Sequence, residues 1–139
     1  MSAPICHYYF ADWDVKLLAP LDMVRRPMDE ILDATNGCGR KGHLDEHVPD
    51  TIWGLDISGA CRVHDWMYGH ADTREEENYA DAIFGANLIS TIQQHTTFWP
   101  LKWLRLRRAY KYIDAVALTN CIDVATLDAL GITKEVGLC

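Results

Sequence analysis

Four side chains that can do chemistry recur at helical spacing in GACRVHDWMYG, residues 59–69. They stand at positions i, i+3, i+4 and i+7: Cys61, His64, Asp65 and Tyr68. This spacing is the stripe that a helix normally buries against its neighbours. Burying ionisable groups is costly unless they are paired or hydrogen-bonded. The pattern therefore indicates a functional site, and a His-Asp pair exposed on a helix surface is the alternative.

A second carboxylate is expected to face this stripe from the next helix. Asp81 lies in an otherwise apolar surround, with Phe84 and Leu88 on the same helix face. A short connection favours antiparallel neighbours. At about 1.5 Å of rise per residue, His64 and Asp81 then reach similar heights. Such a pair suits a general base, because the carboxylate fixes the imidazole tautomer and the other ring nitrogen accepts a proton.

The glycine-rich loop NGCGRKG, residues 36–42, is a candidate cation site. The loop could turn several main-chain carbonyls toward one point, and calcium takes oxygen ligands of this kind as well as carboxylates. Asp65 is the candidate carboxylate ligand. Zinc is the weaker choice because the loop offers no set of thiolates and imidazoles. A disulfide between Cys38 and Cys61 would hold the loop against the helix, with two buried thiols as the alternative.

Together these motifs resemble the calcium-dependent phospholipases A2. The resemblance rests on N-G-C-G-x-x-G at 36–42, C-x-x-H-D-x-x-Y at 61–68 and A-D-x-x-F at 80–84. It covers residues 36–90, and its specific part is the spacing of Cys, His, Asp and Tyr. The implied fold is mainly α and phospholipase A2-like: two antiparallel catalytic helices, a Gly-rich calcium loop and an N-terminal helix packed across them.

The resemblance also implies a role for each residue. His64 would activate water for attack on the sn-2 ester of a glycerophospholipid, with Asp81 orienting it and Tyr68 as a supporting phenol. Asp65 would bind calcium through its carboxylate. Main-chain carbonyls would supply further calcium ligands: Gly37, Gly39 and Lys41. Calcium and the N–H of Gly39 would stabilise the developing oxyanion.

The departures from the family pattern concern cysteine. Ala60 stands where many members have a second cysteine, and Trp66 and Met67 replace the usual x-Cys before the tyrosine. The microbial and the viral or phage members are therefore the better analogues. The N-terminal residues lack the pattern of a secretory signal, and no run approaches the roughly 20 apolar residues that cross a bilayer. Location thus stays open, with non-classical export or association with a virion favoured.

One mainly helical domain is predicted for the 139 residues. Helices are expected over 20–35 with a restart at Pro27, over 58–68, over 73–94 and over 99–119. Ser58 is expected to be the N-cap of one helix, and Asp72 with Glu75 is expected to form the capping box of the next. Residues 36–56 are expected to be one long loop.

The charge of the chain is uneven. Its net charge is −7, which argues against general nucleic-acid binding, yet residues 98–112 contain five basic and no acidic residues. Trp and Arg together suit the headgroup layer of an anionic bilayer. The residues expected at the membrane surface are Trp99, Lys102, Trp103, Arg105, Arg107 and Arg108. Alternatively, the aromatic residues pack in the core beside solvated arginines, or the segment binds a partner protein or a nucleic acid.

The function expected from these features is calcium-dependent hydrolysis of phospholipid sn-2 esters at a membrane surface. One alternative is a non-catalytic lipid-binding or structural module with the same fold. Another is an esterase that uses the same dyad on soluble esters. The remaining histidines show no ligand spacing and are expected in loops or at the surface: His7, His43, His47, His70 and His95.

Overall fold

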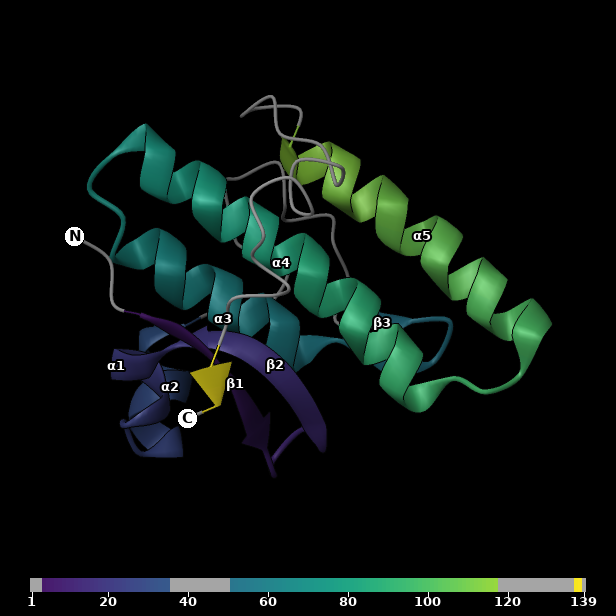
Figure 1. Cartoon of the computed structure of the whole chain (residues 1–139), viewed down its shortest axis with the longest axis horizontal. Helices are drawn as coiled ribbons and strands as arrows, with labels where there is room; N and C mark the ends of the chain where they lie inside the picture. Colours follow the sequence, from purple (N-terminus) through teal and green to yellow (C-terminus); the bar gives the residue numbers. More distant parts are fainter. Residues whose placement is uncertain (1–3, 36–50, 118–136, 139) are drawn as a thin grey trace.

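The computed structural model describes residues 4–35, 51–117 and 137–138 as a mostly helical small domain (Figure 1). The elements in chain order are β1 (Ile5–Phe10), β2 (Val15–Pro20), α1 (Leu21–Val24), α2 (Met28–Ala34), β3 (Thr51–Ile52), β4 (Leu55–Asp56), α3 (Ser58–Gly69), α4 (Arg74–His95), α5 (Trp99–Ala117) and β5 (Gly137–Leu138).

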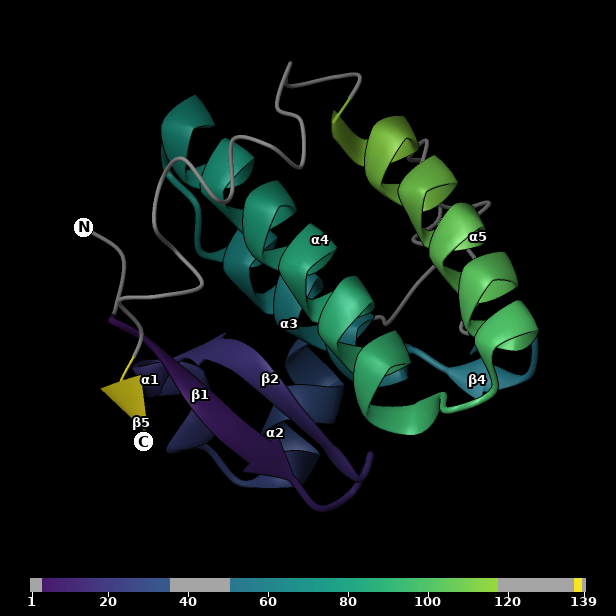
Figure 2. The same ribbon diagram turned by 45° about the vertical axis from the view of Figure 1, so that its right-hand side comes forward.

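Three helices form the body of the domain. Each of the helices α3, α4 and α5 runs antiparallel to the one before it, and α4 packs against both of the others (Figure 1). The β1–β2 hairpin and the short α1 and α2 lie on the α3–α4 side, whereas α5 lies away from them (Figure 2). The apolar core between these layers includes Leu17, Met23, Val63, Ile83, Leu88 and Ile92. None of the helices in the described part of the chain is both long enough and apolar enough to cross a membrane.

The predicted helices are confirmed, with corrections at their caps. The chain restarts as α2 directly after Pro27, and α3 and α4 begin within one residue of the predicted positions. Ser58 is the first helical residue rather than the N-cap, because Ile57 precedes it with non-helical dihedrals. The N-cap of α4 is Thr73, whose hydroxyl accepts from the N–H of Glu76 at 3.2 Å. The predicted capping box was therefore placed one residue too early.

The further helix that the resemblance implied at the N-terminus is wrong, since residues 5–20 form an antiparallel hairpin instead. The run ICHYYF is rich in aromatic residues, which favour strands, and a turn follows it. Asp14 takes a left-handed φ of 49° at this turn, a conformation that Asp tolerates. Strict alternation is absent because β2 is buried along most of its length. β1 is the middle strand of its sheet, with β2 antiparallel on one side and β5 parallel on the other.

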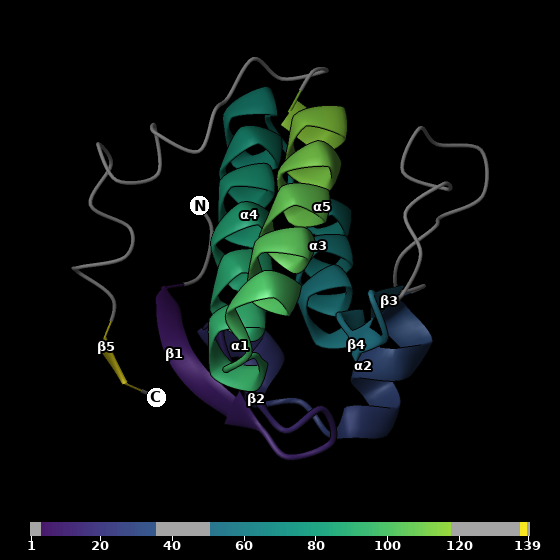
Figure 3. The ribbon, with the colours of Figure 1, turned by 90° about the vertical axis from the view of Figure 1, so that its right-hand side faces the viewer.

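Side-chain amides of α4 bind the outer edge of β2. Asn87 accepts from the N–H of Leu18 through Oδ1 and donates to its carbonyl through Nδ2, both at 2.8 Å. Gln94 makes the same pair of bonds to Lys16, at 2.9 and 2.7 Å. These bonds replace those that a further strand would make, so an edge that could pair with another chain is covered. The hairpin is thereby held beside α4, as the end-on view shows (Figure 3).

The expected long loop contains a second small hairpin. Thr51 pairs with Asp56 and Ile52 pairs with Leu55, while residues 36–50 lie outside the described residues. The two turn residues, Trp53 and Gly54, both have left-handed φ angles, of 47° and 78°. Two such residues are typical of the tight type I′ turn.

Candidate functional site

The predicted contact between His64 and Asp81 is confirmed. The Nε2 atom of His64, on α3, lies 2.7 Å from Oδ1 of Asp81, on α4. The His64 side chain is 12% exposed and the Asp81 side chain 2% exposed. The dyad thus sits inside the α3–α4 interface, with the imidazole at its more accessible end.

Aromatic rings hold the imidazole in place. The ring of Phe84 lies 4.8 Å from the ring of His64, and the ring of Tyr68 lies 5.0 Å from it, measured between centroids. Tyr68 is therefore in the predicted neighbourhood, although its predicted role toward Asp81 stays a prediction. Burial raises the pKa of Tyr79, two residues before Asp81. The Tyr79 phenol therefore stays protonated in the near-neutral pH range in which a histidine can act as a base.

The geometry assigns different tasks to the two imidazole nitrogens. In neutral His64 the N–H faces Asp81, because the carboxylate can only accept. Nε2 then donates and Nδ1 keeps its lone pair. The Asp81 carboxylate, at Nε2, also stabilises the imidazolium that would form if Nδ1 took a proton. In this tautomer Nδ1 is the ring nitrogen with a lone pair that can accept a proton.

Asp65 directly follows His64 on α3 and is 8% exposed. A buried carboxylate is a suitable ligand for a hard cation such as calcium, which needs several oxygen donors. The other predicted donors, the carbonyls of Gly37, Gly39 and Lys41, lie outside the described residues. Within the described ranges, no three His, Cys, Asp or Glu side chains form a metal-binding group. Asp65 is therefore the one predicted calcium ligand that lies within the described residues, and its role as a ligand stays a prediction.

The cysteines bear on the predicted disulfide. Cys61 is disulfide-bonded, as is Cys6 on β1. Cys38 lies outside the described residues, so the pairing of Cys38 with Cys61 stays a prediction. The alternative in which Cys61 is a free buried thiol is not what the structure shows.

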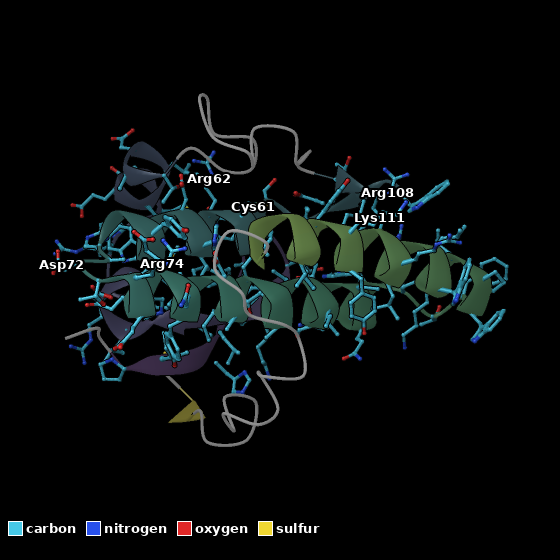
Figure 4. The ribbon with its side chains drawn as sticks, turned by 90° about the horizontal axis from the view of Figure 1, so that it is seen from above. Cys61, Arg62, Asp72, Arg74, Arg108 and Lys111 are labelled. Atoms are coloured by element: carbon cyan, nitrogen blue, oxygen red, sulfur yellow. The ribbon has the colours of Figure 1, made fainter. Side chains whose placement is uncertain are left out.

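Arg62 is a site-flanking residue that the sequence analysis missed. It follows Cys61 on α3 (Figure 4), and its Nη1 donates to the carbonyl and, at 3.0 Å, to the hydroxyl of Thr35. The same nitrogen donates to the carbonyl of Leu32 at 3.3 Å. The end of α2, directly before the predicted calcium loop, is thereby attached to the dyad helix. No sequence spacing signals this contact, because its partners lie about 30 residues away.

Replacing Arg62 with Ala should lower the free energy of unfolding by about 1–3 kcal/mol, because buried acceptors at Thr35 lose their donor. Urea unfolding followed by circular dichroism would measure this. Arg26→Ala is the matched control, since Arg26 makes an exposed ion pair with Glu30. That variant should lose less than about 1 kcal/mol. Equal losses in the two variants would refute the anchoring role of Arg62.

The basic aromatic segment is exposed rather than part of the core. Trp99 is 73% exposed and Trp103 51% exposed, and Arg107 and Arg108 are also exposed. The core-packing alternative holds for the opposite face of α5, where Leu106 packs against the core and Ala109 and Ile113 are buried. The other two residues expected at the membrane surface, Lys102 and Arg105, are partly buried.

Arg105 is partly buried and is held by two hydrogen bonds. Its Nη1 donates to the Thr96 hydroxyl at 2.8 Å, and its Nη2 donates to the carbonyl of Trp53 at 2.9 Å. Arg105 thereby connects the β3–β4 hairpin to α5, and its expected place at a membrane surface stays a prediction. Of the histidines expected away from the site, His70 and His95 are exposed and His7 is partly exposed, while His43 and His47 lie outside the described residues.

Comparison of the chain with protein families, curated proteins and solved structures gave no match. The function is therefore inferred from the residues and their geometry.

Proposed function

We propose that this protein is a phospholipase A2-like hydrolase that cleaves the sn-2 ester of glycerophospholipids with the aid of calcium. The observation that carries the proposal is the 2.7 Å contact between His64 and Asp81 across two antiparallel helices. The spacing of Cys61, His64, Asp65 and Tyr68 supports it, because a buried carboxylate directly follows the dyad histidine on α3.

In the proposed reaction His64 is the general base. Nδ1 takes a proton from a water molecule while Nε2–H remains bonded to Asp81. Asp81 keeps the ring in this tautomer and stabilises the positive charge that the ring gains. Nδ1 then returns the proton to the leaving glycerol oxygen, so the base is regenerated when the fatty acid and the lysophospholipid leave.

Asp65 and the main-chain carbonyls of Gly37, Gly39 and Lys41 would hold the calcium ion. When bound, calcium supplies a positive charge next to the ester carbonyl, where the reaction develops negative charge. The N–H of Gly39 would donate a hydrogen bond to the same oxygen. Tyr68, packed on the imidazole, would keep the ring from turning away from Asp81.

The proposal is tested by fatty acid release from mixed anionic vesicles, in calcium and in excess chelator. Release in calcium that stops with the chelator is the expected result. A water-soluble monomeric ester serves as the second substrate. Equal turnover of vesicles and monomeric ester would assign the dyad to a soluble-ester esterase. No release from either substrate would leave a non-catalytic module.

Asp65→Asn should weaken calcium binding and hydrolysis together, because the amide keeps the shape of the side chain but loses its charge. We expect calcium affinity to fall by at least roughly 10- to 100-fold, which is the loss when a residue that only supports a metal ligand is removed. Isothermal titration with calcium measures this directly. Asp72→Asn, at the connection before α4, is the charge-matched control. Calcium affinity retained in Asp65→Asn would remove Asp65 from the ligand set.

A further inference from the structure

The outward face of α5 joins the β3–β4 hairpin to form one surface. We define this α5 surface by Trp53, Trp99, Trp103, Arg107, Arg108 and Lys111. All six residues are exposed. Arg108 and Lys111 lie toward the opposite end of the molecule from Asp72 and Arg74 (Figure 4). The surface is thus away from the connection between α3 and α4.

Each arginine on this surface contacts a tryptophan. The guanidinium carbon of Arg107 lies 5.3 Å from the ring centroid of Trp103, one helical turn away. That of Arg108 lies 5.8 Å from the ring of Trp53, on the hairpin. Cation–π pairs of this kind keep aromatic rings and positive charges together on one side of a protein. The α5 surface therefore offers flat apolar rings and cations side by side.

Trp53 is held in a conformation that its side chain disfavours. Its φ of 47° lies in the left-handed region, where a bulky residue is rare. Asn or Asp is the usual first residue of a turn of this type, with Gly second. The ring is nevertheless 51% exposed, so its burial does not offset the strain. Arg105 fixes the hairpin by donating to the Trp53 carbonyl. Strain of this kind, fixed by its surroundings, indicates a functional position.

We propose that the α5 surface docks on an anionic lipid bilayer, with Trp53 as an anchor that the helix alone does not supply. The α5 surface presents three exposed cations, Arg107, Arg108 and Lys111, from a segment, 98–112, that has no acidic residue. On a chain of net charge −7 this local positive charge matches an anionic surface. Tryptophan prefers the bilayer interface, where its ring is apolar and its N–H reaches polar headgroups. Docking requires neither His64 nor calcium, so it goes beyond the proposed hydrolysis and stands apart from it.

The decisive variant is Trp53→Asn, because Asn suits the turn better than Trp does. The variant should fold with an unchanged or higher thermal midpoint and bind anionic vesicles roughly 10-fold more weakly, since the anchor's apolar area is lost. The vesicles contain phosphatidylserine and phosphatidylcholine, and binding is measured by co-sedimentation in chelator. Unchanged vesicle affinity in a folded Trp53→Asn variant would overturn the proposal.

The charge contribution has its own matched pair of variants. Arg107→Gln with Arg108→Gln should weaken vesicle binding about 25-fold, the product of roughly five-fold for each cation near the surface. Arg25→Gln with Arg26→Gln removes the same charge from an exposed turn beside α1 and should have little effect. Equal losses in the two double variants would mean that only net charge matters and would overturn the assignment to this surface.

Lipid composition and competition complete the test. Binding should fall strongly on pure phosphatidylcholine vesicles and at high salt, because the cations are exposed. Equal affinity for neutral vesicles would overturn the proposal. Displacement of the protein from vesicles by an equally charged oligonucleotide would assign the surface to polyanions in general, which also overturns it. Vesicle binding without hydrolysis would support docking and count against the proposed function alone.

Discussion

His64→Gln should reduce calcium-dependent release of the sn-2 fatty acid by about 10²- to 10⁴-fold while the protein remains folded. Glutamine can still donate to Oδ1 of Asp81, so the contact across α3 and α4 can persist. It cannot accept a proton as Nδ1 of the imidazole does, and a lost general base removes about 10²- to 10⁴-fold of rate. The reaction would then depend on water that no group activates.

Initial rates on anionic vesicles, with thermal unfolding and calcium titration of the same preparation, measure this result. Calcium affinity should be that of the wild type, and the thermal midpoint should move by only a few degrees. His95→Gln, at the exposed end of α4, is the matched control and should keep full activity. Activity retained in His64→Gln would exclude the imidazole as the base. Loss of folding in that variant would make His64 structural.

Asn87→Ala should lower the free energy of unfolding by about 2–4 kcal/mol, a large share of the stability of a small domain. Asn87 is fully buried and satisfies both main-chain groups of Leu18. Alanine leaves that N–H and carbonyl without these partners and opens space beside α4, and both effects destabilise.

Chemical denaturation of Asn87→Ala beside Gln94→Ala measures the cost of burial directly. Gln94 makes the same two bonds to Lys16, but at an exposed position where water can replace them. Its loss should cost less than about 1 kcal/mol. Equal losses in the two variants would show that burial of the Asn87 amide does not determine its contribution.

The dyad could be predicted because it depends on short-range geometry. Helical spacing puts His64 on the buried stripe of α3, and a short connection to α4 fixes the height of Asp81. Both helices begin within one residue of the predicted positions, since proline and capping residues act locally. These local sequence signals were therefore sufficient to predict the contact between His64 and Asp81.

The N-terminal hairpin could not be predicted in the same way. β2 is buried along most of its length, so the alternation that identifies a half-buried strand is missing. Its outer edge is satisfied by Asn87 and Gln94, about 70 to 80 residues further along the chain. An N-terminal helix was expected from the resemblance alone, and the aromatic run of β1 with Asp14 in the turn was the local signal against it.

The positions of Arg62, Arg105 and Trp53 also depend on long-range contacts. In sequence Arg62 and Arg105 are two cations among many, yet each donates to main-chain carbonyls of a distant element. Trp53 precedes Gly54, and a Trp-Gly pair between two short apolar stretches is a weak turn signal. Its left-handed φ and its exposure become visible only in the folded hairpin.

The most direct test of the proposed hydrolysis uses phospholipid with a different acyl chain at each position, presented in anionic vesicles with calcium. The wild-type protein should release the sn-2 chain and leave the lysophospholipid that retains the sn-1 chain, with one fatty acid formed per lysophospholipid. Mass spectrometry of both products shows which ester was cut. Release of the sn-1 chain, or no release by folded, calcium-loaded protein, would contradict the role of His64 and Asp81 as the dyad of a phospholipase A2-like enzyme.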